Sequence, residues 1–240
     1  MKVLIESISS ILDEELQNKP DYVTEERWEK VKRIRPLEDK KRSLLVGRLL
    51  QRMCIECGIK DPVYGTQENG KLVLINQPNL AFSISHSGEY AVLAYERDVT
   101  AIGVDIQQIR NISEGVRKRI LHEKEQWIEE MPVTSEKNSN KEQAVGSVSS
   151  IQNLDMNRIW AIKESYVKMT GEGLAHDFRK LYIDFEKKVI RDENGRCASF
   201  SEPEAPEGYV LAVTVEAPEG YVLAVTEEAA EGYAPAALVE

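Results

Sequence analysis

Residues 159–173 read IWAIKESYVKMTGEG, and their apolar positions recur with the period of an α-helix. Glu164 and Lys168 lie together on a second face of this helix, one turn apart. The simplest interpretation of the pair is a solvent-exposed ion pair worth about 0.3–0.5 kcal/mol. A functional interpretation requires partners for these two charges elsewhere in the chain. The apolar stripe, which we expect to face the core, consists of Ile159, Ile162, Tyr166 and Met169.

The composition is that of a globular protein with one large domain or two small ones. The chain has 240 residues, of which 42% are hydrophobic. No apolar run approaches the length of about eighteen residues that a membrane span needs, and residues 1–16 carry acids where a signal peptide is apolar. We therefore expect a cytoplasmic protein without a membrane partner. Cys54 and Cys57 form a single C-x-x-C and Cys197 is isolated, which favours buried thiols over a zinc site.

The formal net charge of −10 is concentrated at the C-terminal end. Residues 202–240 hold nine Glu and no Lys or Arg, so residues 1–201 carry 31 positive and 32 negative side chains. Within this nearly neutral body, residues 27–48 hold nine Lys or Arg against three acids. Such a segment either binds an anionic ligand or forms a solvated helix face. No feature of the charge distribution calls for a nucleic acid.

The same order of elements occurs twice along the chain. The first set is a helical pattern at 39–57, Glu-Asn-Gly at 68–70 and an apolar strand at 90–95, and the second is a helical pattern at 157–171, Glu-Asn-Gly at 193–195 and an apolar strand at 209–215. Asn-Gly between apolar stretches predicts a hairpin because both residues tolerate positive φ. We predict an α+β fold of two similar halves, 1–103 and 104–215, with a ligand cleft between them.

Two segments stand outside this plan. Residues 132–155 are polar and lack sustained periodicity, which predicts a surface loop. The sequence EAPEGYVLAVT occurs at 204–214 and again at 216–226, and a degraded third copy follows at 228–239. Only the first copy corresponds to a strand of the first half, so we assign no function to residues 216–240.

Polar side chains share one face of a strand predicted at 102–107. Ile102, Val104 and Ile106 alternate there with Gly103, Asp105 and Gln107. Asp105 and Gln107 therefore point to the same side of the strand. Together with Glu164 they provide three oxygen ligands, enough for Mg²⁺ with a bound diphosphate. The alternative is that Asp105 is a turn residue at the end of the strand.

A second group of polar residues occurs in FSISHSGEYAVLA at 82–94. Ser85, His86, Ser87 and Gly88 are expected to form a turn between two strands, where hydroxyls, an imidazole and backbone N–H groups suit phosphate oxygens. A Ser–His nucleophile pair is the alternative, but adjacent residues seldom present a nucleophile to its base, and the chain contains no G-x-S-x-G.

Three of these motifs together resemble the 4′-phosphopantetheinyl transferases of the larger type that activates surfactin synthetase. They are SISHSG at 83–88, IGVDI at 102–106 and WAIKESYVK at 160–168. The last two match the paired signature G-[IV]-D and [FW]-x-x-K-E-[AS]-x-x-K, and the resemblance runs from about Thr24 to about Val215. It implies a monomeric pseudo-dimer with coenzyme A in the cleft. The small trimeric carrier-protein synthases have half this length and fit less well.

The resemblance also implies roles for individual residues. Asp105 and Glu164 would bind Mg²⁺, with Gln107 in the place of a family Glu, and Glu164 and Lys168 would be catalytic. Gln107 keeps an amide oxygen for the metal but brings no charge. The residues that the resemblance implies for coenzyme binding are Arg27, Lys30, Arg42, Ser43, Lys71, Ser85, His86 and Lys163, of which the first four would hold the 3′-phosphate.

The reaction that the resemblance implies is attack by a serine hydroxyl of an acyl or peptidyl carrier protein on the β-phosphate of coenzyme A, with release of 3′,5′-ADP. Two alternatives remain open. A non-catalytic protein that binds coenzyme A or a carrier protein would keep the basic segment without needing a base beside the metal. An acyl-coenzyme A acyltransferase would give no reason for metal-binding carboxylates.

Overall fold

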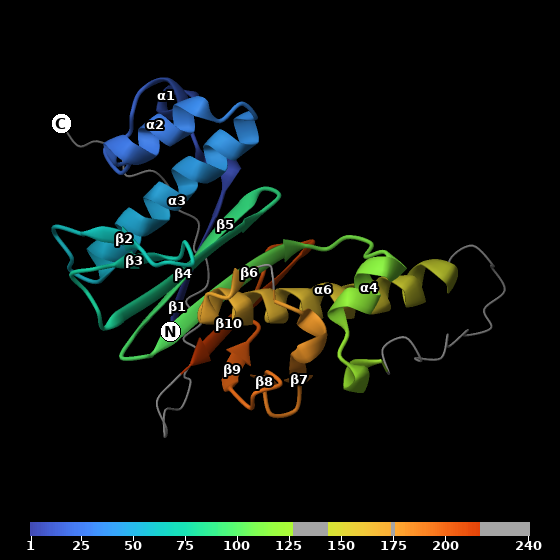
Figure 1. The fold of residues 1–240 in the computed structure, drawn as a ribbon. Helices are drawn as coiled ribbons and strands as arrows, with labels where there is room; N and C mark the ends of the chain where they lie inside the picture. The colour runs from blue at the N-terminus through green and yellow to red at the C-terminus, as the bar shows by residue number, and fades with distance from the viewer. Residues whose placement is uncertain (127–143, 174–175, 217–240) are drawn as a thin grey trace.

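The computed structural model describes residues 1–126, 144–173 and 176–216, which form two α+β halves (Figure 1). Each half has one long helix packed on an antiparallel sheet. The helices of the first half lie on one side of the central strands, and α6 lies on the other side with the C-terminal strands. The predicted α+β fold of two similar halves is therefore confirmed.

The first half contains a sheet with the strand order β1-β5-β4, a separate β2-β3 hairpin and three helices. Its elements are β1 (Lys2–Ser7), the 3-10 helix η1 (Ile8–Ser10), α1 (Asp13–Gln17), α2 (Glu25–Arg33), α3 (Leu37–Glu56), β2 (Tyr64–Thr66), β3 (Leu72–Leu74), β4 (Leu80–Ser87) and β5 (Tyr90–Arg97). Helix α2 begins where the Thr24 hydroxyl accepts a hydrogen bond from the backbone N–H of Arg27.

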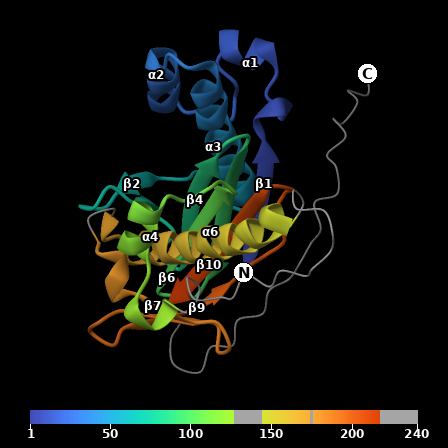
Figure 2. The ribbon, with the colours of Figure 1, turned by 90° about the vertical axis from the view of Figure 1, so that its right-hand side faces the viewer.

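The second half contains a sheet with the strand order β6-β10-β9-β8-β7, and α6 crosses it over β6 and β10 (Figure 2). Its elements are β6 (Ala101–Gln108), α4 (Glu114–Ile120), η2 (Glu123–Glu125), α6 (Ala144–Thr170), η4 (Phe178–Lys180), β7 (Tyr182–Asp184), β8 (Val189–Arg191), β9 (Cys197–Ser201) and β10 (Tyr209–Glu216). Gly171, with a φ of 77°, ends α6 in the left-handed conformation that glycine adopts without strain.

The two sheets pack against each other through an apolar layer between the halves. Because side chains alternate along a strand, each sheet turns one set toward its own helix and the other set toward this layer. The buried residues of the layer are Val92, Ala94, Val99, Ile102, Val104, Ile106, Leu211, Val213 and Val215. Gly103 and Asp105 therefore face α6, which is the side where the candidate site lies.

Strands β4 and β6 lie side by side along a line that we call the junction. There, serine side chains of β4 bond to the backbone of β6 in place of the backbone hydrogen bonds of a regular β-ladder. The hydroxyl of Ser83 accepts from the backbone N–H of Val104 at 3.1 Å, and that of Ser87 accepts from the N–H of Gln108 at 3.1 Å. These bonds satisfy donors on an edge strand. The prediction that residues 85–88 form a turn is wrong for Ser85, His86 and Ser87, because the antiparallel pairing of β4 with β5 continues to Ser87 opposite Tyr90.

Both Glu-Asn-Gly segments form hairpin turns, as predicted, and the two turns have matching hydrogen bonds. Gln67 N–H donates to the Lys71 carbonyl, and Asp192 N–H donates to the Arg196 carbonyl. The turns are five-residue connections in which only the glycines have positive φ, 86° at Gly70 and 85° at Gly195. The two asparagines do not have positive φ, although Asn tolerates it, so only the glycine of each turn is left-handed.

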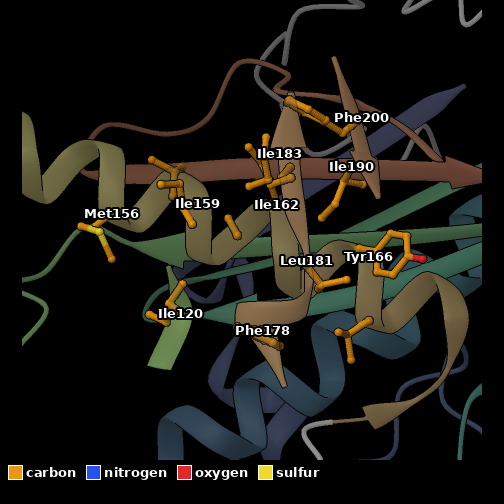
Figure 3. Close-up of a cluster of buried hydrophobic side chains, with 14 of the residues drawn as sticks. Ile120, Met156, Ile159, Ile162, Tyr166, Phe178, Leu181, Ile183, Ile190 and Phe200 are labelled. Carbon is orange, nitrogen blue, oxygen red and sulfur yellow. The ribbon is translucent and has the colours of Figure 1, made fainter. Parts of the chain in front are cut away.

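Helix α6 packs as its apolar stripe predicted. Ile159, Ile162 and Tyr166 have no exposed surface, and Met169 is buried as well. Figure 3 shows the first three side chains among residues of β7, β8 and β9, including Ile183, Ile190 and Phe200. The core of the second half is therefore built on this one helix.

Two predictions need correction or lie outside the described residues. The surface loop predicted for 132–155 is wrong for residues 144–155, which belong to α6, because the helix extends well before the apolar stripe. Residues 132–143 and the repeats at 217–240 lie outside the described residues. Among the described residues, none of the helices has the length and apolarity needed to cross a membrane.

Gly103 sets the distance between β6 and α6. A methyl group at this position would overlap the carbonyl oxygen of Ser165 and lie 2.5 Å from the backbone nitrogen of Met169. Both atoms belong to the backbone of α6, so neither can rotate away. The helix can approach the strand this closely only because position 103 has no side chain.

We expect Gly103→Ala to lower the free energy of unfolding by about 3 kcal/mol, because the added methyl forces α6 away from β6. Urea denaturation followed by circular dichroism measures the change. Gly115→Ala in α4 is the matched control, because a methyl there meets no atom within 4 Å, and we expect it to change stability by less than about 1 kcal/mol. Equal stabilities of the two variants would contradict this account of α6 packing.

Candidate active site

Helix α6 and strands β4 and β6 bring four predicted site residues together at the junction. Lys168 Nζ donates to Asp105 Oδ1 at 2.6 Å and to Ser85 Oγ at 2.7 Å. Ser85 Oγ in turn donates to Asp105 Oδ1 at 2.8 Å. Glu164 lies close enough to Asp105 for their charges to interact. The simple interpretation of Glu164 and Lys168 as an exposed pair is wrong, because Lys168 pairs with Asp105 and Glu164 is only 6% exposed.

The electrostatics of this cluster favour an additional cation. Burial and, to a smaller extent, the charge of Asp105 raise the pKa of Glu164, Lys168 offsets part of the effect, and the resulting pKa is about 7. Asp105 Oδ2 is buried and has no hydrogen-bond partner. Two carboxylates that repel each other, one with an unpaired oxygen, are the type of donor set that binds Mg²⁺.

Gln107 lies on the same face of β6 as Asp105 and is half-buried. Its amide nitrogen donates to the carbonyl oxygen of Gln108 at 3.0 Å. Among the described residues, there is no cluster of three or more His, Cys, Asp or Glu side chains that could hold a metal ion. A metal site here would thus consist of the two carboxylates, with the Gln107 amide as the third protein group.

Basic residues of the first half approach the same cluster. Arg42 donates to the carbonyl oxygen of Gly88 at 2.5 Å and pairs with Asp39 at 2.6 Å. Partial burial lowers the pKa of His86, and the positive charges of Arg42 and Lys168 lower it further. Arg27 Nη1 donates to the Ser43 carbonyl at 3.5 Å. Arg27 and Arg42 therefore place two guanidinium groups between α2, α3 and the junction, whereas the lowered pKa leaves His86 mostly neutral near pH 7.

Two predicted coenzyme-binding lysines have protein partners in this structure. Lys30 is 71% exposed and pairs with Glu26 at 2.9 Å on the surface of α2. Lys71 donates to the carbonyl oxygens of Ile102 and Met169 at 2.9 and 3.2 Å. Burial lowers the pKa of Lys71 to about 8. In this structure, Lys71 thus connects the β2-β3 hairpin of the first half to β6 and α6 of the second.

The structure places the predicted site residue Lys163 in the interior of the second half, away from the junction. Its side chain is fully buried and pairs with Glu125 at 2.6 Å. The ammonium also donates to the carbonyl oxygens of Ile120 and Phe178. These contacts lie inside the second half, and the coenzyme contact implied for Lys163 remains a prediction.

Sequence reasoning missed Tyr209, which holds the turn between β4 and β5. The Tyr209 hydroxyl accepts from the backbone N–H of Glu89 at 3.0 Å, and its ring packs edge-on against Tyr90 at 4.9 Å. A side chain at Gly88 would overlap this hydroxyl. The EGYV repeat was the available signal, but a repeat does not indicate which contacts its tyrosine makes.

A surface basin of about 650 Å³ lies at the other end of the second half, lined by residues that include His122, Arg179 and Tyr182. A second basin of about 400 Å³ lies between Lys2, Cys57 and Arg97 in the first half. Neither basin includes a predicted site residue. The predicted ligand cleft between the halves therefore remains a prediction.

The fold and the site define a class of protein, in which two α+β halves meet at a buried cluster of carboxylates and a lysine, with basic residues alongside. Two family models match the chain. The one described as the 4′-phosphopantetheinyl transferase superfamily matches residues 101–226, and the one described as 4′-phosphopantetheinyl transferase, N-terminal, matches residues 12–98. The chain belongs to the 4′-phosphopantetheinyl transferase superfamily.

Curated relatives agree with this assignment. The chain is 29% identical over 208 residues to the 4′-phosphopantetheinyl transferase ffp of Bacillus subtilis, and the match covers 83% of this chain and 85% of the relative. It is 26% identical to the 4′-phosphopantetheinyl transferase Sfp of Bacillus subtilis (strain 168), with the same coverage. It is 30% identical over 195 residues to the 4′-phosphopantetheinyl transferase gsp of Aneurinibacillus migulanus, covering 78% of this chain and 73% of the relative.

The raised pKa of Glu164 predicts a pH-dependent stability in the absence of metal. Between its ordinary value of 4.5 and about 7, the folded protein holds a proton on Glu164 that the unfolded chain has lost. The free energy of unfolding therefore falls as pH rises through this window. We expect the neutral variant Glu164→Gln to match the wild type near pH 4.5 and to exceed it by about 2–3 kcal/mol at pH 8.

Urea denaturation in EDTA at pH 4.5 and pH 8 measures this difference. The exposed Glu207→Gln serves as the matched control, and we expect no pH-dependent gain from it. A Glu164→Gln effect of the same size at both pH values would contradict the burial and charge repulsion described above.

Proposed function

We propose that this chain transfers the 4′-phosphopantetheine group of coenzyme A to a serine of an apo carrier protein and releases 3′,5′-ADP. Membership of the superfamily and the transferase activity for which the relatives are named support this activity. The observation that carries it in this chain is the contact of the partly exposed Lys168 with the buried Asp105, close to the buried Glu164. We further propose that the protein works as a cytoplasmic monomer.

Asp105 and Glu164, with Gln107 beside them, are the residues that would hold Mg²⁺. The unpaired Asp105 Oδ2 and the repulsion between the two carboxylates support this assignment. When bound, the ion would neutralise charge on the diphosphate of coenzyme A. Because Gln107 is neutral, its amide oxygen would bind Mg²⁺ more weakly than a carboxylate would.

Glu164 is the residue that we assign to accept the proton of the attacking serine hydroxyl. Without a bound cation the pKa of Glu164 is about 7. A bound Mg²⁺ would lower this pKa, so Glu164 would be ionised and able to accept a proton at neutral pH. The serine oxygen forms a bond to the β-phosphorus, and the bond from that phosphorus to the bridging oxygen breaks. The electron pair leaves on 3′,5′-ADP, where the charge of Lys168 stabilises it.

The basic residues of the first half are assigned to the 3′-phosphate of coenzyme A, as the resemblance implies. Arg27 and Arg42 present guanidinium groups, which bind phosphate oxygens in pairs. Arg27 is also close to Ser43. Ser85 and His86 lie on β4 nearer to Lys168, where the diphosphate is expected.

We expect Arg27→Ala to raise the KM for coenzyme A by tenfold or more, and to raise the KM for dephospho-coenzyme A, which lacks the 3′-phosphate, much less. Lys30→Ala, one turn along α2, is the matched comparison. Since Lys30 is largely exposed and already paired with Glu26, we expect a smaller effect from it. Steady-state kinetics with both substrates measure the difference, and equal losses for the two substrates would refute the assignment of Arg27.

The activity itself is tested by mass spectrometry of several apo carrier proteins, acyl and peptidyl, after incubation with coenzyme A and Mg²⁺. We expect a mass gain equal to phosphopantetheine on the carrier serine. An acyl gain from an acyl-coenzyme A would instead identify an acyltransferase. Binding without any mass change across all the carriers would identify a non-catalytic coenzyme A or carrier-protein binder.

A further inference from the structure

A buried ion pair involves the residue that precedes Glu164 in α6 and is not used in the proposed chemistry. Lys163 Nζ lies 2.6 Å from Glu125 Oε2, and the two side chains are 0% and 1% exposed. Lys163 precedes Glu164 in α6, whereas Glu125 lies in η2, 38 positions earlier in the chain. The pair therefore connects the helix that carries the proposed base to a distant segment of the second half.

Backbone groups complete the hydrogen bonding of this pair. The Lys163 ammonium also donates to the carbonyl oxygens of Ile120, at 2.7 Å, and Phe178, at 3.2 Å. Glu125 accepts from the backbone N–H of Ile183 on one oxygen and from that of His122 on the other, both at 2.9 Å. The pair thus joins α6 to the end of α4, to η2, to η4 and to β7, and Figure 3 labels three of these anchoring residues around α6.

Stability alone does not explain a charged pair at this depth. Removing two charges from water costs free energy that their mutual attraction only partly returns, and well-packed apolar side chains often stabilise a core as well. Three acceptors at fixed positions, however, hold the Lys163 ammonium in one place. Since the side chain is attached to α6, this constraint sets the rotation of the helix about its axis.

The opposite side of α6 is held just as closely. Ser165 bonds to Thr214 of β10 at 2.5 Å, and Gly103 allows the backbone of α6 to contact β6. Lys163 and Ser165 flank Glu164 in the sequence, so the two anchors fix the direction in which Glu164 and, one turn later, Lys168 project. A change at either anchor turns both side chains relative to Asp105.

We infer that the Glu125–Lys163 ion pair is a positioning element that aligns Glu164 and Lys168 with Asp105 and does not itself contact coenzyme A. The inference rests on the proposed transferase activity. We therefore expect loss of the ion pair to lower kcat while the KM for coenzyme A stays nearly constant, because the residues assigned to the 3′-phosphate belong to the first half.

The test compares Lys163→Met with Arg158→Met, five residues earlier in α6. Arg158 also ties the helix to a distant segment through an ion pair, with Glu202 at 2.7 Å, but it is partly exposed and remote from the junction cluster. At a temperature where both variants are folded by circular dichroism, we expect Lys163→Met to lower kcat at least tenfold with less than a twofold change in the KM for coenzyme A. We expect Arg158→Met to keep kcat within twofold.

Glu125→Gln provides a second variant in case Lys163→Met does not fold. It keeps the size of the side chain and one acceptor oxygen but removes the charge, and we expect a fall in kcat of at least threefold at a nearly constant KM. Wild-type kcat in the folded variants would overturn the inference. A raised KM for coenzyme A at unchanged kcat would overturn it as well, by showing that Lys163 contacts the coenzyme.

The wild type is assayed in parallel with the same carrier protein. If the wild type transfers phosphopantetheine and the variants keep its kcat, the inference fails and the proposed function stands. If the wild type transfers nothing to any carrier, the proposed function fails and the inference fails with it. The two failures are therefore distinguishable.

Discussion

The close contact between helix α6 and strand β6 is the constraint on which the rest of the structure depends. The backbone of α6 reaches the strand because Gly103 has no side chain. Glu164 and Lys168 come from the helix and Asp105 comes from the strand, so their separation follows from that one contact. The core of the second half is organised on the other side of the same helix. The packing of α6 and the alignment of the candidate site residues therefore both depend on Gly103.

The charges at the junction are arranged so that the proposed base keeps a high proton affinity. Lys168 bonds to Asp105 and Ser85, which leaves Glu164 to experience burial and the negative charge of Asp105. Had Lys168 paired with Glu164 along the helix, the glutamate would have been a weaker base. The same arrangement leaves one Asp105 oxygen without a partner. The placement of Lys168 therefore leaves Glu164 as a stronger base and also leaves an Asp105 oxygen free to bind a cation.

Strand β4 serves two purposes because its side chains alternate. Ser83, Ser85 and Ser87 face the second half and bond to β6 or to its Asp105. His86 lies on the opposite face of the strand, where it interacts with the charges of Arg42 and Asp39 of α3. One eight-residue strand therefore joins the two halves through its serines and presents His86 on the side proposed for the coenzyme phosphates. The turn that follows it is held from both sides, by Arg42 and by Tyr209.

Local patterns predicted the elements that depend on period and turn chemistry. The apolar stripe of residues 159–169 predicted a buried helix face, and the two Glu-Asn-Gly segments predicted hairpins, because these signals arise from neighbouring residues. The alternation in β6 likewise placed Asp105 and Gln107 on one face. The start of α6 was missed, since its first residues lack that apolar period.

The sequence by itself thus determined the class of fold, the order of the elements and the residues able to carry charge at the junction. Only the tertiary structure decided which of those charges meet. Lys163 and Lys168 lie in one motif on one helix, yet the first is buried against Glu125 and the second bonds to Asp105. Their partners are 38 and 63 positions away in the chain. A helical period gives the direction of a side chain but not what lies there, because that depends on how distant segments pack around the helix.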